Sequence, residues 1–146
     1  MQLDGTVEIK APRDRVWAFV SDPRQVGWCG PGVQSIEAVD ATHFTAKASL
    51  KLGFFTTGLT VHLETLDTEP LERVVIRAVG QAQGTAVDAT TTLRLTGPAA
   101  GPTTVTFSAE VAISGSFAGV ATRFLESGGE HQLGQPLDCI RAKLEV

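Results

Sequence analysis

Alternation of apolar and polar residues is the dominant pattern along this chain. It first appears over residues 2–10, where Leu3, Val7 and Ile9 alternate with polar neighbours. Similar runs cover residues 44–52, 59–64, 73–78, 87–95 and 104–113, and a further strand is expected from Gln34. A period of two places alternate side chains on opposite faces of a sheet, and clean alternation is typical of antiparallel sheets with one wet face. The pattern predicts an antiparallel sheet of about seven strands.

Glycine and proline separate the alternating runs. The separators are Gly53, Glu69-Pro70, the segment Gly80–Gly84 and the segment Gly97–Pro102. Such residues mark turns because proline fixes φ and glycine tolerates a positive φ. The segment Gly80–Gly84 lacks the lysine and the following helix that a phosphate-binding loop needs. We therefore interpret it as a turn between two strands.

Two short helices are predicted after the first strand. Pro12 suits the first position of a helix, and the apolar side of that helix would contain Val16, Trp17, Phe19 and Val20. The sequence Ser21-Asp22-Pro23 can cap a second short helix that runs to about Gly27. Pro31-Gly32 then predicts a tight turn before the next strand.

A long C-terminal helix is predicted after residues 114–116, where the period becomes helical. Phe117, Val120, Ala121 and Phe124 fall on one face. In an unbroken helix this face would continue through Gly128, His131, Gln135 and Cys139, with Leu133, Leu137, Ile140 and Leu144 on the opposite side. Two interpretations remain open. Either Gly128-Gly129 and Pro136 bend or re-phase the helix, or its second half presents a mildly polar strip to the interior.

The order of elements predicts an α+β helix-grip fold. One strand, two short helices, a run of strands and one long helix imply a curved antiparallel sheet around the C-terminal helix. The chain of 146 residues fits one domain, covering 1–146.

The inward rows of the predicted sheet contain many small residues, which suggests a hollow. These small residues are Gly5, Ala46, Ala48, Ala78, Ala89, Thr91 and Ala109. Either the last helix packs directly on them, or an apolar cavity remains, as in most small-molecule sites. We favour the cavity. Its predicted lining is Phe44, Ala46, Ala48, Leu50, Leu59, Val61, Leu63, Val74, Ile76, Val87, Ala89, Thr91, Leu93, Phe107, Ala109, Val111, Phe117, Val120 and Phe124.

Two glycine-containing connections are candidates for the cavity entrance. The first contains Trp28, Cys29, Pro31 and Gly32, and the second contains Phe54 and Phe55 between Gly53 and Gly58. The two phenylalanines either pack on the core as strand residues or form an exposed apolar tip that closes over a ligand or contacts a partner.

Composition and charge exclude several classes of protein. Apolar residues make up 42% and charged residues 19% of the chain, as in globular proteins. The net charge is −4, and no cluster of Lys and Arg could neutralise nucleic-acid phosphates, so we expect no nucleic-acid partner. No apolar stretch is long enough for a transmembrane segment, and residues 1–5 do not resemble a secretory signal. These features predict a cytoplasmic protein.

The reactive side chains predict neither catalysis nor a cofactor. Cys29 and Cys139 lie far apart, without metal-ligand or redox spacing, so we expect two free thiols, with Cys29 a buried structural thiol at the cavity mouth. His43, His62 and His131 share no ligand spacing, which predicts no metal site, and His62 falls on the wet face. The chain has no Tyr, and its acidic residues fall mostly on outward rows. His131 with Glu126 or Glu130 is the only conceivable acid–base pair, and a solvated helix face explains it better.

The first 35 residues carry a resemblance to a known family. Gly5, Ala11-Pro12, Val16-Trp17, Asp22-Pro23 and Cys29-Gly30-Pro31-Gly32 together resemble the opening of the CoxG family, whose members are carbon monoxide dehydrogenase subunits. That family belongs to the helix-grip superfamily of START-type lipid carriers, birch-pollen allergen-type proteins and polyketide cyclases. The chain departs from the pattern at Gly30, where the family favours an aliphatic residue, and at Val33, where a second cysteine is common.

The resemblance implies an accessory protein with a hydrophobic cavity. The expected ligand is a lipophilic small molecule, quinone-like in our interpretation, and the expected partners are a molybdenum hydroxylase of the carbon monoxide dehydrogenase type and the inner membrane surface. The expected location is the cytoplasm, peripheral to that membrane. Two alternatives remain open: a polyketide cyclase- or dehydrase-like enzyme, and a ligand-free module that recruits a partner enzyme.

Overall fold

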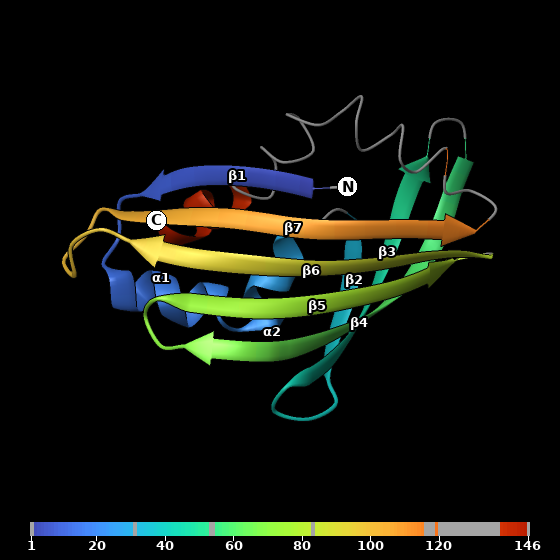
Figure 1. Ribbon diagram of the computed structural model, residues 1–146, viewed down its shortest axis with the longest axis horizontal. Coiled ribbons are helices and arrows are strands. Elements are labelled where there is room, and N and C mark those ends of the chain that lie inside the picture. The colour runs from blue at the N-terminus through green and yellow to red at the C-terminus, as the bar shows by residue number, and fades with distance from the viewer. Residues whose placement is uncertain are drawn as a thin grey trace.

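A single antiparallel sheet organises the molecule in the computed structural model, which describes residues 2–30, 32–52, 55–82, 84–115, 119 and 138–145 (Figure 1). The strands are β1 (Gln2–Ile9), β2 (Val33–Ala38), β3 (His43–Leu52), β4 (Phe55–Glu69), β5 (Arg73–Ala82), β6 (Thr85–Thr96) and β7 (Thr103–Gly115). The helices are α1 (Arg13–Val20), α2 (Pro23–Val26), the 3-10 turn η1 (Gly27–Cys29) and a last helix over 138–144. The sheet has seven strands in the order β1-β7-β6-β5-β4-β3-β2.

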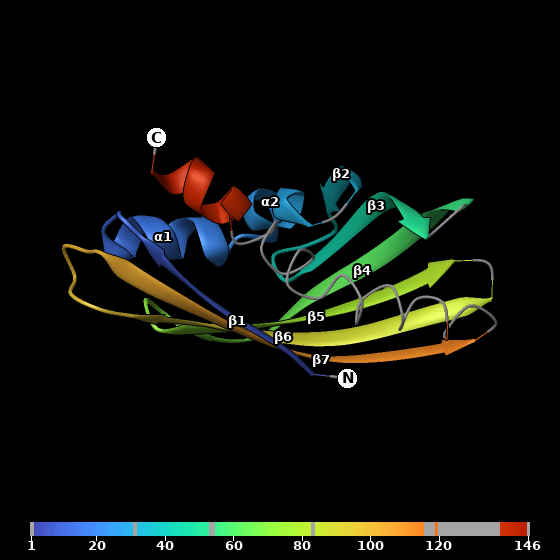
Figure 2. The same ribbon diagram turned by 90° about the horizontal axis from the view of Figure 1, so that it is seen from above.

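The sheet is curved, and the described helices lie on one side of it. Figure 2 shows α1, α2 and the C-terminal helix together over one half of the sheet's length. The predicted curved antiparallel sheet and the two short helices after the first strand are therefore confirmed. The sheet is open, since β1 and β2 form its two edges.

The predicted long C-terminal helix is observed only in part. The described helix covers residues 138–144 and is short. Residues 117, 120 and 124, on which the predicted inward face rested, lie outside the described residues. Within the last helix, Ile140 and Leu144 are buried and Asp138 and Arg141 are exposed, so its apolar side faces the core.

The second short helix begins as the sequence predicted, whereas Pro12 is the residue before α1 and not its first helical residue. Pro12 has an extended conformation and precedes α1, whose Val16 and Val20 are fully buried. Asp22 caps α2, because its carboxylate accepts a hydrogen bond from the backbone N–H of Arg24 at 3.0 Å, and Pro23 occupies the first helical position. Pro12 and Asp22 thus mark the beginnings of the two helices.

The main core lies between these helices and the sheet. Its buried residues come from β1, α1, η1, β5, β6, β7, the last helix and the segment before α1: Val7, Ile9, Ala11, Val16, Val20, Cys29, Val74, Leu93, Leu95, Val105, Ile140 and Leu144. Apolar burial of this kind is the dominant stabilising contribution in folding. The last helix thus belongs to the same core as α1.

The predicted turn at Gly80–Gly84 is wrong in its first half. Gly80, Gln81 and Ala82 continue β5, and β6 begins at Thr85. Gly84 has a positive φ of 80°, so it does serve a turn. Gly80 instead serves packing, because a Cβ on this buried glycine would lie 3.2 Å from Cδ1 of Leu59. A glycine within a strand can mark such a close approach.

A β-bulge explains why the strand predicted over residues 59–64 ended too early. The pairing of β4 with β5 shifts between Thr65 and Asp67, and Leu66 between them is exposed. A bulge inserts one residue and reverses the inward and outward alternation. The alternating pattern therefore ended near residue 64, although β4 continues to Glu69.

Candidate functional site

The strand register brings the predicted small residues together on one face. Ala89 of β6 lies opposite Ala78 of β5 and opposite Val111 of β7. On the other side of β5, Gly80 lies opposite Val61, which in turn lies opposite Ala46 of β3. These residues share the face of Leu93 and Val74, which belong to the core under the helices. The small residues therefore line the helix-bearing, concave side of the sheet.

Burial differs between the two halves of this face. Under the helices, Val74 and Val105 have no exposed surface. Farther along the same rows, Val61, Leu63, Ala78, Val87 and Ala89 remain partly exposed. Apolar side chains that face inward and yet stay partly accessible are typical of a binding surface.

The remaining predicted lining residues are distributed as follows. Phe44, Ala46, Ala48, Ala109 and Val111 are buried on the concave face, and Leu59, Ile76, Thr91 and Phe107 are partly buried there. The side chain of Leu50 and residues 117, 120 and 124 lie outside the described part of the structure. Whether these residues together enclose a cavity stays a prediction.

The inward rows carry no ionisable side chain on the described strands. They hold apolar residues, glycine and threonine only; the threonines are Thr57, Thr65, Thr68, Thr85, Thr91 and Thr103. General acid–base catalysis needs a titratable group within hydrogen-bond reach of the substrate. The inward rows of the described strands therefore present apolar groups and hydroxyls, without an acid or a base.

The first predicted entrance segment is partly exposed. Trp28 is 48% exposed on η1, whereas its neighbour Cys29 is buried. Gly32 is exposed and has a positive φ of 68°. Pro31 lies outside the described residues.

The second predicted entrance segment joins β3 to β4. Phe55 begins β4, and its backbone pairs with Leu52. Its side chain, and the whole of residue 54, lie outside the described residues. The choice between a core role and an exposed tip stays open.

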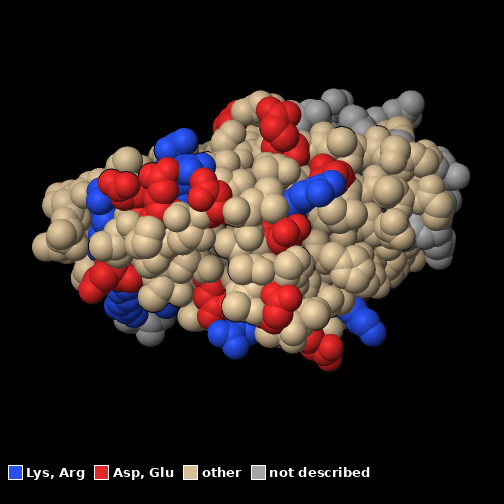
Figure 3. All heavy atoms as spheres, turned by 60° about the horizontal axis from the view of Figure 1, so that its bottom comes forward, with Lys and Arg blue, Asp and Glu red and all other residues tan. Residues whose placement is uncertain are grey.

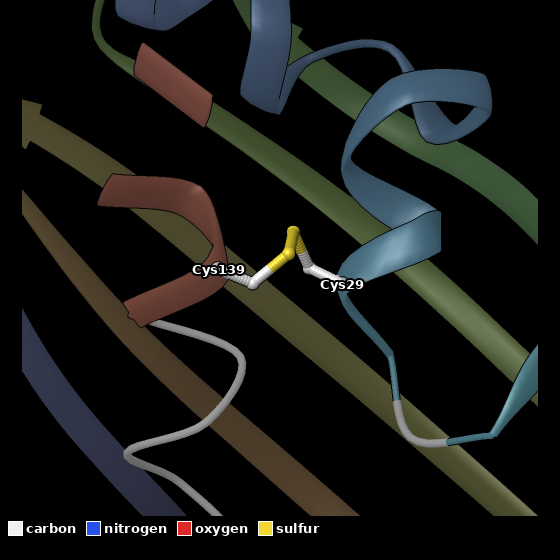
Figure 4. The surroundings of a disulfide bond; sticks show 2 residues. All are labelled: Cys29 and Cys139. Atoms are coloured by element: carbon white, nitrogen blue, oxygen red, sulfur yellow. A yellow bond between two sulfur atoms is a disulfide. The ribbon is translucent and has the colours of Figure 1, made fainter. Parts of the chain in front are cut away.

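The prediction of two free thiols is wrong. Cys29 and Cys139 form a disulfide, with a Cα–Cα distance of 5.5 Å across a sequence separation of 110 residues (Figure 4). The bond joins η1 to the last helix, which packs beside it over the sheet. Neither spacing nor neighbouring residues signal this pairing, because tertiary packing of the last helix creates it.

Ionisable groups occur on the outer face, and several of them form ion pairs. Arg77 donates to Asp88 across β5 and β6, with Nη2 2.6 Å from Oδ2. This hydrogen bond raises the pKa of Arg77 and lowers the pKa of Asp88. Arg73 is paired with Asp67 and Glu69 in the same way, and hydrogen bonds to both carboxylates raise its pKa. Over the described residues of the surface in Figure 3, acidic and basic groups are intermixed without a broad basic patch.

The described histidines lie at exposed positions. His62 is on the outer face, as predicted. His43 Nδ1 is 2.9 Å from Asp40 Oδ1, and its Nε2 is 3.5 Å from Glu64 Oε1. Among the described residues, no group of three or more His, Cys, Asp or Glu side chains is placed to hold a metal ion. None of the described helices has the length and apolar character to span a bilayer.

Comparison with known proteins gives one family match. The sequence model of CoxG, a subunit of carbon monoxide dehydrogenase, matches residues 5–145. No curated protein sequence matches the chain significantly.

Solved structures show the same fold at low sequence identity. A conserved protein from Geobacillus kaustophilus has a TM-score of 0.85 and 19% identity, covering 99% of this chain and 95% of its own. An aromatase/cyclase from Streptomyces sp. R1128 has a TM-score of 0.73 and 16% identity, with coverage of 99% and 93%. A START superfamily protein from Mycobacterium smegmatis has a TM-score of 0.71 and 12% identity, with coverage of 99% and 97%.

Proposed function

Since the chain belongs to the CoxG family of carbon monoxide dehydrogenase subunits, we propose that it is a non-catalytic accessory protein that holds a lipophilic small molecule. In this proposal the molecule binds to the concave face and serves a molybdenum hydroxylase of the carbon monoxide dehydrogenase type. In the START-like fold, a curved sheet and helices surround the space in which such a molecule would bind.

One observation carries the proposal: the concave face is apolar and yet incompletely buried. Val61, Ala78 and Ala89 share the rows of fully buried core residues and remain partly exposed. In this proposal, a bound molecule would cover the apolar surface that these residues leave accessible. Removal of this apolar surface from water would stabilise the complex by about 25 cal/mol per Å².

A quinone-like molecule fits the chemistry of this face. Its ring and tail would contact the alanines and valines, and its carbonyl oxygen would accept a hydrogen bond from a threonine hydroxyl such as that of Thr91. Thr91 lies between Ile76 and Ala109 on the inward row. A lipophilic electron carrier would suit a partner that oxidises its substrate, and the proposed location is the cytoplasm beside the inner membrane.

A cyclase-like enzyme is the second candidate, favoured by the fold shared with the Streptomyces aromatase/cyclase. At 16% identity that similarity concerns the fold alone. The absence of ionisable side chains from the inward rows of the described strands argues for the binding function. A ligand-free recruitment module is the third candidate, since a partly exposed apolar face can also contact a partner protein; saturable binding of a small molecule separates the first candidate from it.

Titration with ubiquinone-1, followed by quenching of tryptophan fluorescence, tests the proposal. The wild-type protein should bind saturably. The double variant Ala78→Leu with Ala89→Leu fills the concave face and should weaken binding about tenfold or more, equivalent to about 1.4 kcal/mol. The control Thr90→Leu with Thr92→Leu adds apolar residues to the outer face of β6 and should leave binding unchanged.

The stability of the same double variant tests whether the concave face is already filled by the chain itself. If the chain itself fills the space beside Ala78 and Ala89, the two leucines should cost about 1–3 kcal/mol of stability through overpacking. Absence of saturable binding by the wild-type protein, together with such a loss, would reject the proposed function.

A further inference from the structure

We propose that the Cys29–Cys139 disulfide is a redox-controlled latch that fixes the last helix to η1 and thereby slows ligand release from the concave face. The proposal rests on the proposed function, because it concerns regulation of the same binding face.

The η1 end of the latch is fixed to the sheet. A Cβ on Gly27 would lie 2.8 Å from Cδ1 of Ile36, so this turn packs closely on β2. Three residues after Cys29, the carbonyl of Gly32 accepts a hydrogen bond from the backbone N–H of Ser49 on β3, at 2.9 Å. Cys29 is therefore held between two attachments to neighbouring strands.

The other end of the latch is Cys139, in the first described turn of the last helix, here called its start. Beyond Cys139, the described attachments of this helix are the buried side chains of Ile140 and Leu144 and hydrogen bonds to the β1 side. The guanidinium of Arg141 donates to the carbonyl of Glu8, and Glu145 accepts from the backbone N–H of Lys10. These contacts hold the end of the helix near β1, whereas the disulfide holds its start at η1.

The latch borders the candidate binding face. In Figure 2, α2 and the start of the last helix lie near the middle of the sheet's long dimension. Beneath the helices, Leu93 lies opposite Val74, and the next inward pair along the same strands is Thr91 and Ile76. Displacement of the helix start would therefore uncover the concave rows from one end. The redox state of this disulfide would therefore change the rate of ligand release.

The chemistry of opening is thiol–disulfide exchange with a dithiol. A thiolate of the dithiol attacks Sγ of Cys139, which is only partly buried, whereas Cys29 is buried. The Cys29–Cys139 bond breaks, and Cys29 leaves as a thiolate and takes up a proton. The second thiol of the reagent then displaces Cys139, which is also protonated. The protein gains two electrons and two protons, and the dithiol becomes a disulfide.

The proposed cytoplasmic location favours a regulatory role for this disulfide over a purely structural one. Disulfides in reducing compartments are usually transient, catalytic or redox-sensing, whereas those in oxidising compartments are mostly structural. For the proposed location beside a redox enzyme, the oxidised and reduced forms would have different retention times for the same ligand.

Two measurements on the full chain test the latch. The first is the release rate of N-phenyl-1-naphthylamine, a fluorescent apolar probe without thiol reactivity, from oxidised protein and from protein reduced with dithiothreitol. Release should be at least about fivefold faster after reduction, as expected if reduction lowers the affinity by the lower end of typical coupling between sites and leaves the association rate unchanged. The second is hydrogen exchange at residues 140–144, which should accelerate on reduction while β6 and β7 remain protected.

Variants separate the latch from other effects of the reductant. Cys29→Ser with Cys139→Ser should release the probe at the rate of the reduced wild type and should not respond to dithiothreitol. Cys139→Ser alone provides the same readout if the double variant folds poorly.

The outcomes distinguish the two proposals. Saturable probe binding with equal release rates in both redox states would overturn the latch and leave the binding function intact. Unchanged exchange at residues 140–144 on reduction would also overturn it. Absence of probe binding in either state would reject the binding function, and the latch with it.

Discussion

Gly32 and Ser49 approach each other so closely that no side chain fits between them. The N–H of Ser49 donates to the carbonyl of Gly32 at 2.9 Å, and a Cβ on Gly32 would lie 2.0 Å from the carbonyl oxygen of Ser49. Gly32 also has a φ of 68°, in the left-handed region that favours glycine. The glycine thus serves a fixed contact between the start of β2 and β3, in the segment that the sequence offered as a candidate cavity entrance.

Gly32→Ala should therefore destabilise the protein strongly. We expect a loss of about 2–3 kcal/mol or more, from the left-handed conformation and the collision with the Ser49 backbone. Gly58→Ala is the matched control, because a Cβ there meets nothing within 4 Å. That change should be neutral or stabilising by about 0.5 kcal/mol. Urea denaturation of both variants gives the comparison, and equal midpoints would contradict the close contact.

Substitution of Leu71 by glycine should stabilise the protein, in contrast to Gly32→Ala. It lies between β4 and β5 with a φ of 67°, and its side chain is 41% exposed. The left-handed conformation costs a side-chain-bearing residue roughly 1–2 kcal/mol, more than the entropy that glycine loses on folding. Leu71→Gly should raise the free energy of unfolding by about 0.5–1 kcal/mol. Leu71→Ala keeps the strain and should change stability little, so equal effects of the two substitutions would argue against strain at this position.

The strands could be predicted because their two faces differ in polarity almost everywhere. On β6, Val87, Ala89 and Leu93 face inward, while Asp88 and Arg94 are on the outer face. The prediction failed where the local pattern changes for a tertiary reason. The bulge at Leu66 shifts the alternation, and Gly80 is a glycine because Leu59 occupies the space above it. Neither cause is visible in the residues themselves.

The candidate site was predictable in its composition and only partly in its position. The small inward residues are on one face because strand register follows from alternation. The disulfide was not predictable, since Cys29 and Cys139 meet only after the last helix packs against η1. The exposed Trp28 and buried Cys29 are adjacent in sequence, and local pattern does not separate their environments.

The pair of Asp40 and His43 should give the protein a measurable pH dependence. Hydrogen bonds from the backbone N–H of Thr42 and from His43 lower the pKa of Asp40 to about 2. The hydrogen bond to Asp40 raises the pKa of His43 above its usual value of 6.5, with Glu64 contributing. The contribution of Asp40 is present above pH 3.8 and is lost as the pH falls towards 2. The contribution of His43 is complete below pH 6.5 and is lost as the pH rises through its raised pKa.

Both contributions are therefore complete only between about pH 4 and 6.5. A proton NMR titration should show His43 titrating above pH 6.5, and Asp40→Asn should move its pKa back towards that value. The melting-temperature difference between wild type and Asp40→Asn should be largest in this window and should shrink above it. A His43 pKa at or below 6.5 in the wild type would contradict the ion pair.

Leu144 tests whether the last helix is part of the core or is held by the disulfide alone. It is 4% exposed and packs in the cluster that includes Val16 and Val105. Truncation of a buried leucine loses its transfer free energy and leaves a cavity, so Leu144→Ala should cost about 2–5 kcal/mol in the oxidised protein. The control Val39→Ala removes a side chain that is 69% exposed and should cost less than about 0.5 kcal/mol. Urea denaturation without reductant measures both. Because the disulfide prevents the helix from leaving, a small cost for Leu144→Ala under these conditions would mean that the helix is tethered rather than packed.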